Sequence, residues 1–148
     1  MERNVLLGLS WNLPLDIQEE TVCNIASMIE LNPNELLQPG NKDCWENAAK
    51  VLFKLGYPKI KEVIPGLLRW LQDINWPGSN IVMEILVTIP KDVLIPYLED
   101  AVIEALNGHD EIWVESLSYF LEQFDLKENN FTSKEVYLAL VEGREFWK

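Results

Sequence analysis

The chain has 148 residues, 48% of them hydrophobic and six of them Trp, which is the composition of a globular domain with one packed core. Its formal net charge of −12 argues against a nucleic-acid ligand, because the phosphate backbone would be repelled. The apolar runs are too short for a membrane span or a secretory signal, so we expect a cytoplasmic protein with no membrane partner.

The first predicted unit, residues 10–41, is an N-terminal capping helix followed by a turn. Pro14 and Asp16 open the helix. Its apolar residues recur at helical spacing: Ile17, Val22, Ile25, Ala26 and Ile29. A short turn or helix then runs to Pro39-Gly40. We expect this unit to pack on the one that follows.

Residues 42–72 are predicted to form a pair of antiparallel helices. One face of the first helix carries Trp45, Ala48, Ala49, Leu52 and Leu55. Gly56 should end this helix, because glycine adopts the left-handed conformation common at helix C-termini. The second helix should cover about 58–71, and Pro65 inside it should kink it or split it.

Residues 73–107 repeat this pattern, and residues 108–148 form a less regular copy. The first helix of the second pair carries Ile81, Val82, Ile85, Leu86 and Ile89. Pro90 should begin its partner, with Pro96 inside and Asn107-Gly108 as the stop signal. The last unit offers Trp113, Leu117, Phe120, Leu121 and Phe124, then a helix that Thr132 or Ser133 would cap.

The two complete pairs share one register. Trp45 and Trp76 are each followed, at the same distance, by an Ile-Pro pair: Ile64-Pro65 and Ile95-Pro96. The period is about 31 residues, within the range of helical repeats. Trp113 starts the third copy, which departs from the pattern as a terminal repeat commonly does. We therefore predict an all-α fold: a short HEAT-like α-α superhelix of six or seven helices in stacked antiparallel hairpins.

Three sequence strings resemble a known family. They are SWNLP at 10–14, KDCWENAAKVL at 42–52 and RWLQDINWPG at 69–78. Over residues 10–125 the chain resembles the bacterial proteins of the domain-of-unknown-function 5071 family. The resemblance implies a helical-repeat fold and a bacterial cytoplasmic setting, and it implies no activity, because that family has none assigned. Small acidic proteins of this kind often sit beside toxin genes as immunity proteins.

One candidate surface joins matching parts of the two repeats. It comprises Trp45, Glu46, Asn47, Asp73, Asn75 and Trp76. In the competing structural interpretation, the tryptophans pack between repeats and the acids before each helix cap it: Asp43, Asp73, and Asp110 or Glu111. The two asparagines are harder to explain by packing alone, since a half-buried amide needs several hydrogen-bond partners. They would bridge neighbouring turns or contact a ligand.

A second candidate surface follows from the uneven charge. Residues 1–74 hold 10 acids and 7 bases, whereas residues 75–148 hold 14 acids and 5 bases. Such an excess of carboxylates steers a basic surface toward the second half, or simply keeps the protein in solution. The candidate residues here are Glu99, Asp100, Glu104, Trp113 and Glu115. We predict a non-catalytic module that docks a protein with a basic surface, as an antitoxin or immunity protein does.

Two other functions stay open: a scaffold that associates with itself through its end faces, and a hydrolase whose carboxylates hold magnesium. Adjacent acids such as Glu99-Asp100 diverge by about 100° on a helix, so they do not form a catalytic pair.

Cys23 and Cys44 lack a Cys-x-x-Cys spacing, and we expect both to be reduced and buried. With His109 as the single histidine, we predict no catalytic residue, no cofactor and no metal site.

Overall fold

In the computed structural model, which describes Met1 and residues 3–148, all regular secondary structure is helical. The α-helices are α1 (Arg3–Leu7), α2 (Leu15–Ala26), α3 (Trp45–Leu55), α4 (Ile64–Trp70), α5 (Ser79–Val87), α6 (Lys91–Asn107), α7 (Glu111–Leu117), α8 (Tyr119–Gln123) and α9 (Lys134–Gly143). Short 3-10 helices lie between and after them: η1 (Pro33–Leu36), η2 (Lys42–Cys44), η3 (Lys61–Val63), η4 (Glu128–Asn130) and η5 (Arg144–Trp147). The predicted all-α class is confirmed, in more helical segments than the six or seven expected.

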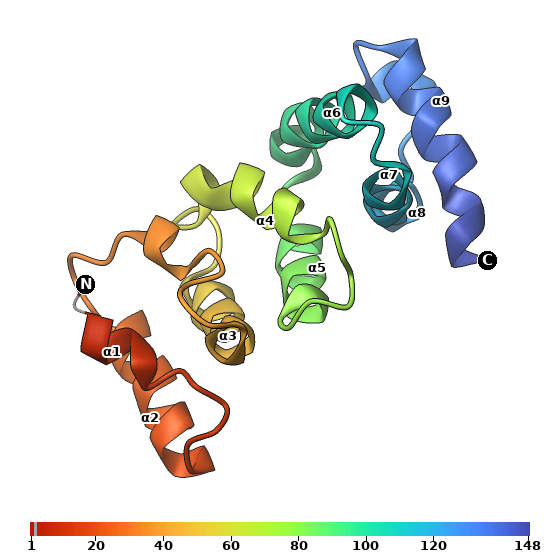
Figure 1. The fold of residues 1–148 in the computed structure, drawn as a ribbon. Coiled ribbons are helices and arrows are strands. Elements are labelled where there is room, and N and C mark those ends of the chain that lie inside the picture. Colours follow the sequence, from red (N-terminus) through yellow and green to blue (C-terminus); the bar gives the residue numbers. More distant parts are fainter. Residues whose placement is uncertain (2) are drawn as a thin grey trace.

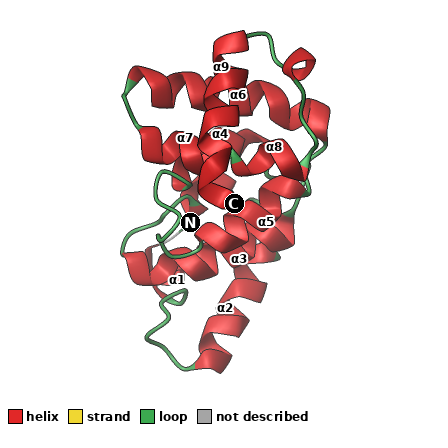
Figure 2. Cartoon of the chain, turned by 90° about the vertical axis from the view of Figure 1, so that its right-hand side faces the viewer, coloured by secondary structure: helices red, strands yellow, loops and turns green. Residues whose placement is uncertain are grey.

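The helices form an elongated array, with α1 and α2 at one end and α9 at the other (Figure 1). α3 packs against both α2 and α5, and α4 packs against both α5 and α6. α7 contacts both α6 and α9, and α9 also contacts α6. Figure 2, turned by 90°, shows α2, α3 and α5 in the same order along the array. Each helix therefore packs mainly on helices that are near it in the sequence.

The internal prolines explain part of the extra segmentation. The predicted helix over 58–71 is split into η3 and α4, and Pro65 falls in the first turn of α4, where its missing N–H leaves no bond unmade. Pro96, in contrast, lies inside the continuous helix α6. Its side chain is exposed, so the Asp92 carbonyl that loses its helical donor can bind water instead. Pro90 directly precedes α6, as predicted.

Three of the predicted helix signals can be checked against individual hydrogen bonds and angles. Gly56 ends α3 with a φ of 63°, and Ser133 caps α9 by accepting from the Val136 N–H. Asp110 caps α7, because its carboxylate accepts the Trp113 N–H at 3.0 Å. The prediction that Asp43 caps its helix is wrong. Its carboxylate instead accepts from the Ser10 hydroxyl. That bond fastens the start of α3 to the N-terminal unit.

The core runs through the whole array, and its largest fully buried side chains include Trp70, Trp113 and Phe120. Cys44 is buried as predicted, but Cys23 is exposed, so the expectation of two buried cysteines is wrong for Cys23. The reason is its position on the end helix α2, which packs on α3 along one side and buries few residues of its own. None of the helices in the described part of the chain combines the length and the apolar character that a membrane crossing requires.

Candidate functional site

The three tryptophans of the repeat pattern pack inside the array. Trp45 contacts Trp76 and Trp70 edge to face, with ring centroids 5.9 and 6.3 Å apart. Trp113 is buried, and its indole N–H donates to the Leu68 carbonyl at 2.9 Å. This bond ties α7 to α4. These contacts join neighbouring units, as the packing interpretation predicts.

The polar members of the first candidate surface do not form one site. Asn47 is buried, and its amide donates to the Leu9 carbonyl at 2.8 Å and to the Gln18 side chain at 2.9 Å. Asp73 accepts the Asn75 N–H at 2.8 Å, which closes a turn before α5. Both residues therefore stabilise the fold. Glu46, Asn75 and Trp76 do line a common hollow of about 390 Å³, at the start of α5.

In the second candidate surface, Glu99 is the buried carboxylate. Glu99 is 6% exposed, and its carboxylate accepts from the Thr132 N–H at 3.1 Å, the Ser133 N–H at 2.8 Å and the Thr132 hydroxyl. Its carboxylate is therefore already engaged by the fold, because these bonds fasten α6 to the start of α9. The sequence spacing indicates that Glu99 is buried. Position 99 lies four residues after Ile95 and three before Val102, on the buried face of α6.

The other acids of this surface differ in exposure. Asp100 is exposed, and so is Glu104, which forms a 3.3 Å ion pair with Arg69. Glu115 is half-buried, and its backbone carbonyl accepts from the Trp147 indole at 2.7 Å. Asp100 is therefore the carboxylate of the predicted set that is both exposed and outside the ion pairs of the described residues.

Asp100 belongs to a hollow that the sequence did not reveal. A stripe along the exposed side of α6 carries Asp92, Pro96, Asp100 and Ile103 at helical spacing. Together with Asn129, Asn130 and Thr132, these residues line a hollow of about 460 Å³, with Glu99 and Ile95 in its floor. We call it the α6 hollow. Within the described part of the chain, its lining contains acids, amides and apolar groups and no Lys or Arg.

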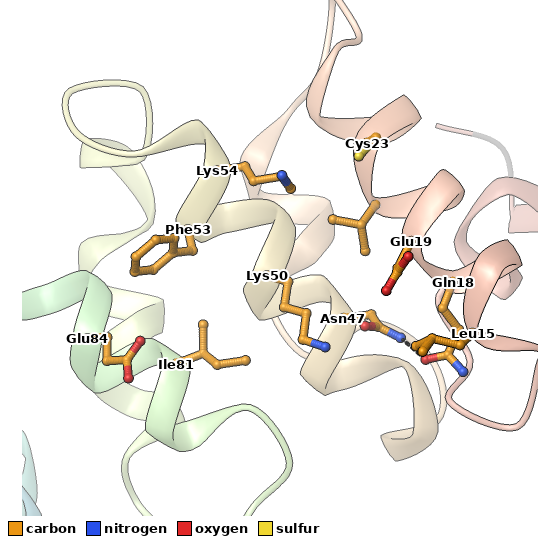
Figure 3. Close-up of a pocket in the computed structure, with 11 residues that line it drawn as sticks. Leu15, Gln18, Glu19, Cys23, Asn47, Lys50, Phe53, Lys54, Ile81 and Glu84 are labelled. Carbon is orange, nitrogen blue, oxygen red and sulfur yellow. Dashed lines mark hydrogen bonds between the residues drawn. The ribbon is translucent and has the colours of Figure 1, made fainter.

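A wider groove of about 810 Å³ crosses the first half of the molecule, and we call it the α3 groove. Lys50, Phe53 and Lys54 of α3 lie between α2 and α5 (Figure 3). Glu19 of α2 and Glu84 of α5 stand on the opposite walls. The lining also contains Leu15, Gln18, Val22, Cys23, Asn47 and Ile81. The groove therefore combines apolar side chains with both signs of charge.

The described residues contain no group of three or more His, Cys, Asp or Glu side chains placed to hold a metal ion. Burial, and after it the carboxylate of Asp43, raises the pKa of Cys44, which keeps the thiol protonated and weakly nucleophilic near neutral pH. Cys44 lines neither the α6 hollow nor the α3 groove, and the cysteine in the α3 groove is Cys23.

These features define an all-helical protein with an extended array, in which the α6 hollow and the α3 groove differ in charge. Residues 38–142 match the family model described as a domain of unknown function (DUF5071), and the chain belongs to this family. The predicted resemblance is confirmed, although the match starts later than residue 10 and extends beyond residue 125. Comparisons with curated proteins and with solved structures gave no match.

Proposed function

We propose that this chain is a non-catalytic protein-binding module whose second half docks a protein with a basic surface. The observation that carries the proposal is the α6 hollow, where the exposed carboxylates of Asp92 and Asp100 flank Pro96 and lie next to the exposed Ile103. Carboxylates beside apolar groups suit a Lys or Arg side chain, which has an apolar stem and a charged head. Asn129 and Asn130 add donors and acceptors at the opposite rim.

The overall charge of the second half of the chain also favours a partner with a basic surface. The half of the chain that contains the α6 hollow has 14 acids and 5 bases. A field of one sign accelerates the encounter with an oppositely charged protein and weakens as salt is added. Apolar contact at Ile103 and Pro96 would then slow dissociation.

The proposal extends to architecture and setting. The pairs α3–α4 and α5–α6 are proposed as successive HEAT-like repeats, which the shared Trp and Ile-Pro register supports. A bacterial cytoplasmic protein that neutralises a basic toxin would fit such a surface, by analogy with small acidic immunity proteins. Stacked helical pairs commonly expose long surfaces that bind other proteins.

The test compares three tagged versions of the intact chain: the wild type, D92K/D100K and the matched control E135K/E142K. The control reverses two exposed carboxylates of α9 and so gives the same net charge. Proteins captured from the host lysate by the wild type are identified, and the leading basic one is purified. Its association rate is then measured by surface plasmon resonance at about 50 and 200 mM salt.

We expect D92K/D100K to slow association by about tenfold and the control by less than about twofold. Binding of the wild type should weaken as salt rises. Equal rates for all three versions would contradict the α6 hollow as the docking site. An interaction that salt does not change would contradict the electrostatic basis of the proposal.

A second candidate function is self-association, and one observation favours it. Several large apolar side chains of the N-terminal unit are exposed: Leu7, Trp11, Leu15, Ile17, Met28 and Ile29. An apolar end face of a helical array suits contact with another array. Light scattering between low and high micromolar concentration tests this function, since a scaffold subunit should gain mass and a monomeric module should not.

A further inference from the structure

The α3 groove contains two cations that the fold leaves unpaired. Lys50 and Lys54 are exposed on one face of α3, one helical turn apart. Neither takes part in an ion pair among the described residues, although Glu19 and Glu84 stand on the walls. They are the two positive charges in the lining of this groove, in a chain with a net charge of −12.

Apolar side chains surround these lysines. Leu15 of α2 is 64% exposed and Phe53 of α3 is 47% exposed, and both line the groove with Ile81 of α5. Each of the three helices therefore contributes at least one apolar side chain. An exposed apolar set interrupted by two charges is the surface that an amphipathic segment covers.

We propose that the α3 groove binds an amphipathic helix of a partner protein, with carboxylates one turn apart that pair with Lys50 and Lys54. A carboxylate at position i and another at i+4 of such a helix have the same spacing as the two lysines when the helix lies along α3. An extended segment has less to gain, because the described residues offer no strand edge to which it could add.

The walls restrict the partner further. Glu19 and Glu84 would repel a helix that is acidic on every side, so its carboxylates should be confined to the ridge that faces α3. This site goes beyond the proposed function, since it lies on other helices and requires the opposite charge. Failure at the α6 hollow and failure at the α3 groove are thus separate results.

The probe is a fluorescein-labelled amphipathic peptide of about 16 residues, stapled because a free helix of this length is marginal in water. Its apolar ridge carries Leu, and its charged ridge carries Glu at every fourth position. Two matched peptides carry Gln or Lys in place of Glu. Each is titrated by fluorescence anisotropy with the intact wild type, K50E/K54E and the control K59E/K61E, whose lysines are exposed between α3 and α4.

The expected result is a charge swap. The Glu peptide should bind K50E/K54E at least about tenfold more weakly than the wild type, while K59E/K61E changes its affinity less than about twofold. The Lys peptide should prefer K50E/K54E. Because all four lysines are exposed, circular dichroism should show the variants folded.

Three results would overturn the proposal. The Glu peptide binding no better than the Gln peptide would remove the role of charge. Equal weakening by K50E/K54E and K59E/K61E would show a general charge effect. A wild type that dimerises in analytical ultracentrifugation, together with a monomeric K50E/K54E, would identify a second copy of the chain as the occupant in place of a separate partner.

Discussion

The α6 hollow and the α3 groove differ in how the fold uses their charged residues. In the α6 hollow, the carboxylate of Glu99 is buried and engaged by Thr132 and Ser133. In the α3 groove, Lys50 and Lys54 are exposed and take part in no ion pair of the described residues. A charge that the fold already uses contributes stability, whereas an unused charge can bind a partner. The following predictions test this division, from the largest expected effect to the smallest.

The largest effect should come from the buried carboxylate. Glu99→Ala removes the acceptor of three donors at the start of α9, and it should lower the free energy of unfolding by about 3 kcal/mol. Glu99→Gln keeps the shape and one acceptor, so it should cost about half as much. Urea unfolding measures both. The control Glu104→Ala, on the exposed side of the same helix, should cost less than about 0.5 kcal/mol. Similar losses for Glu99→Ala and Glu104→Ala would contradict the structural role of Glu99.

The second effect concerns the close packing of the start of α5 against α3 and α4. Gly78 has a φ of 86°, and a Cβ there would lie 3.0 Å from the Trp70 ring and 3.1 Å from Ala49. Gly78→Ala should therefore lower the unfolding free energy by about 2 kcal/mol through strain and crowding between α3 and α5. Thermal unfolding measures this loss. In the control Gly40→Ala, φ is also positive but the added Cβ meets open space. The additional loss of unfolding free energy in Gly78→Ala therefore measures the cost of the close approach to Trp70 and Ala49.

Local signals in the sequence predicted the helix ends well. Gly56, Pro90 and Asp110 act within a few residues of their own position, so their effects can be read from the chain alone. Glu99 shows that charge alone does not indicate exposure, because its place in the apolar stripe of α6 buries it. The family membership was also predictable, since it depends on short strings that survive in one sequence.

The two hollows were not predictable in the same way. Each joins segments that lie far apart in the chain: α6 with the 129–132 region, and α2 with α3 and α5. Helical spacing places a residue on a face of its own helix, and it does not say which other helix that face meets. Asn47 shows this limit, since its partners Leu9 and Gln18 come from the N-terminal unit.

The third prediction uses the two thiols to distinguish groove from core. Cys23 is exposed in the lining of the α3 groove, whereas Cys44 is buried with a raised pKa. A disulfide reagent at neutral pH should modify Cys23 at least about tenfold faster, because the thiolate is the reacting form and must be accessible. Cys23→Ser and Cys44→Ser assign the two phases. Near-equal rates in the folded protein would contradict the difference in burial.

The raised pKa of Cys44 also predicts how the stability of the fold depends on pH. The folded state holds this proton more tightly than the unfolded state, so the contribution is present below the ordinary pKa of the thiol and is lost as pH rises through the folded pKa. Unfolding at increasing alkaline pH should therefore show a smaller loss in Cys44→Ser than in the wild type. An equal loss in the two proteins would assign the alkaline instability to other groups.

The smallest effect concerns Glu104, the candidate acid whose availability to a partner depends on Arg69. The two side chains form a 3.3 Å ion pair with about half of each exposed to solvent. A double-mutant cycle of Arg69→Ala and Glu104→Ala should give a coupling below about 0.5 kcal/mol that decreases with salt. In such a weak pair, Glu104 can exchange Arg69 for a cation of the partner. Glu104 would then extend the docking surface beyond the α6 hollow by one helical turn. A coupling well above 1 kcal/mol would instead place Glu104 with Glu99, among the carboxylates that the fold already uses.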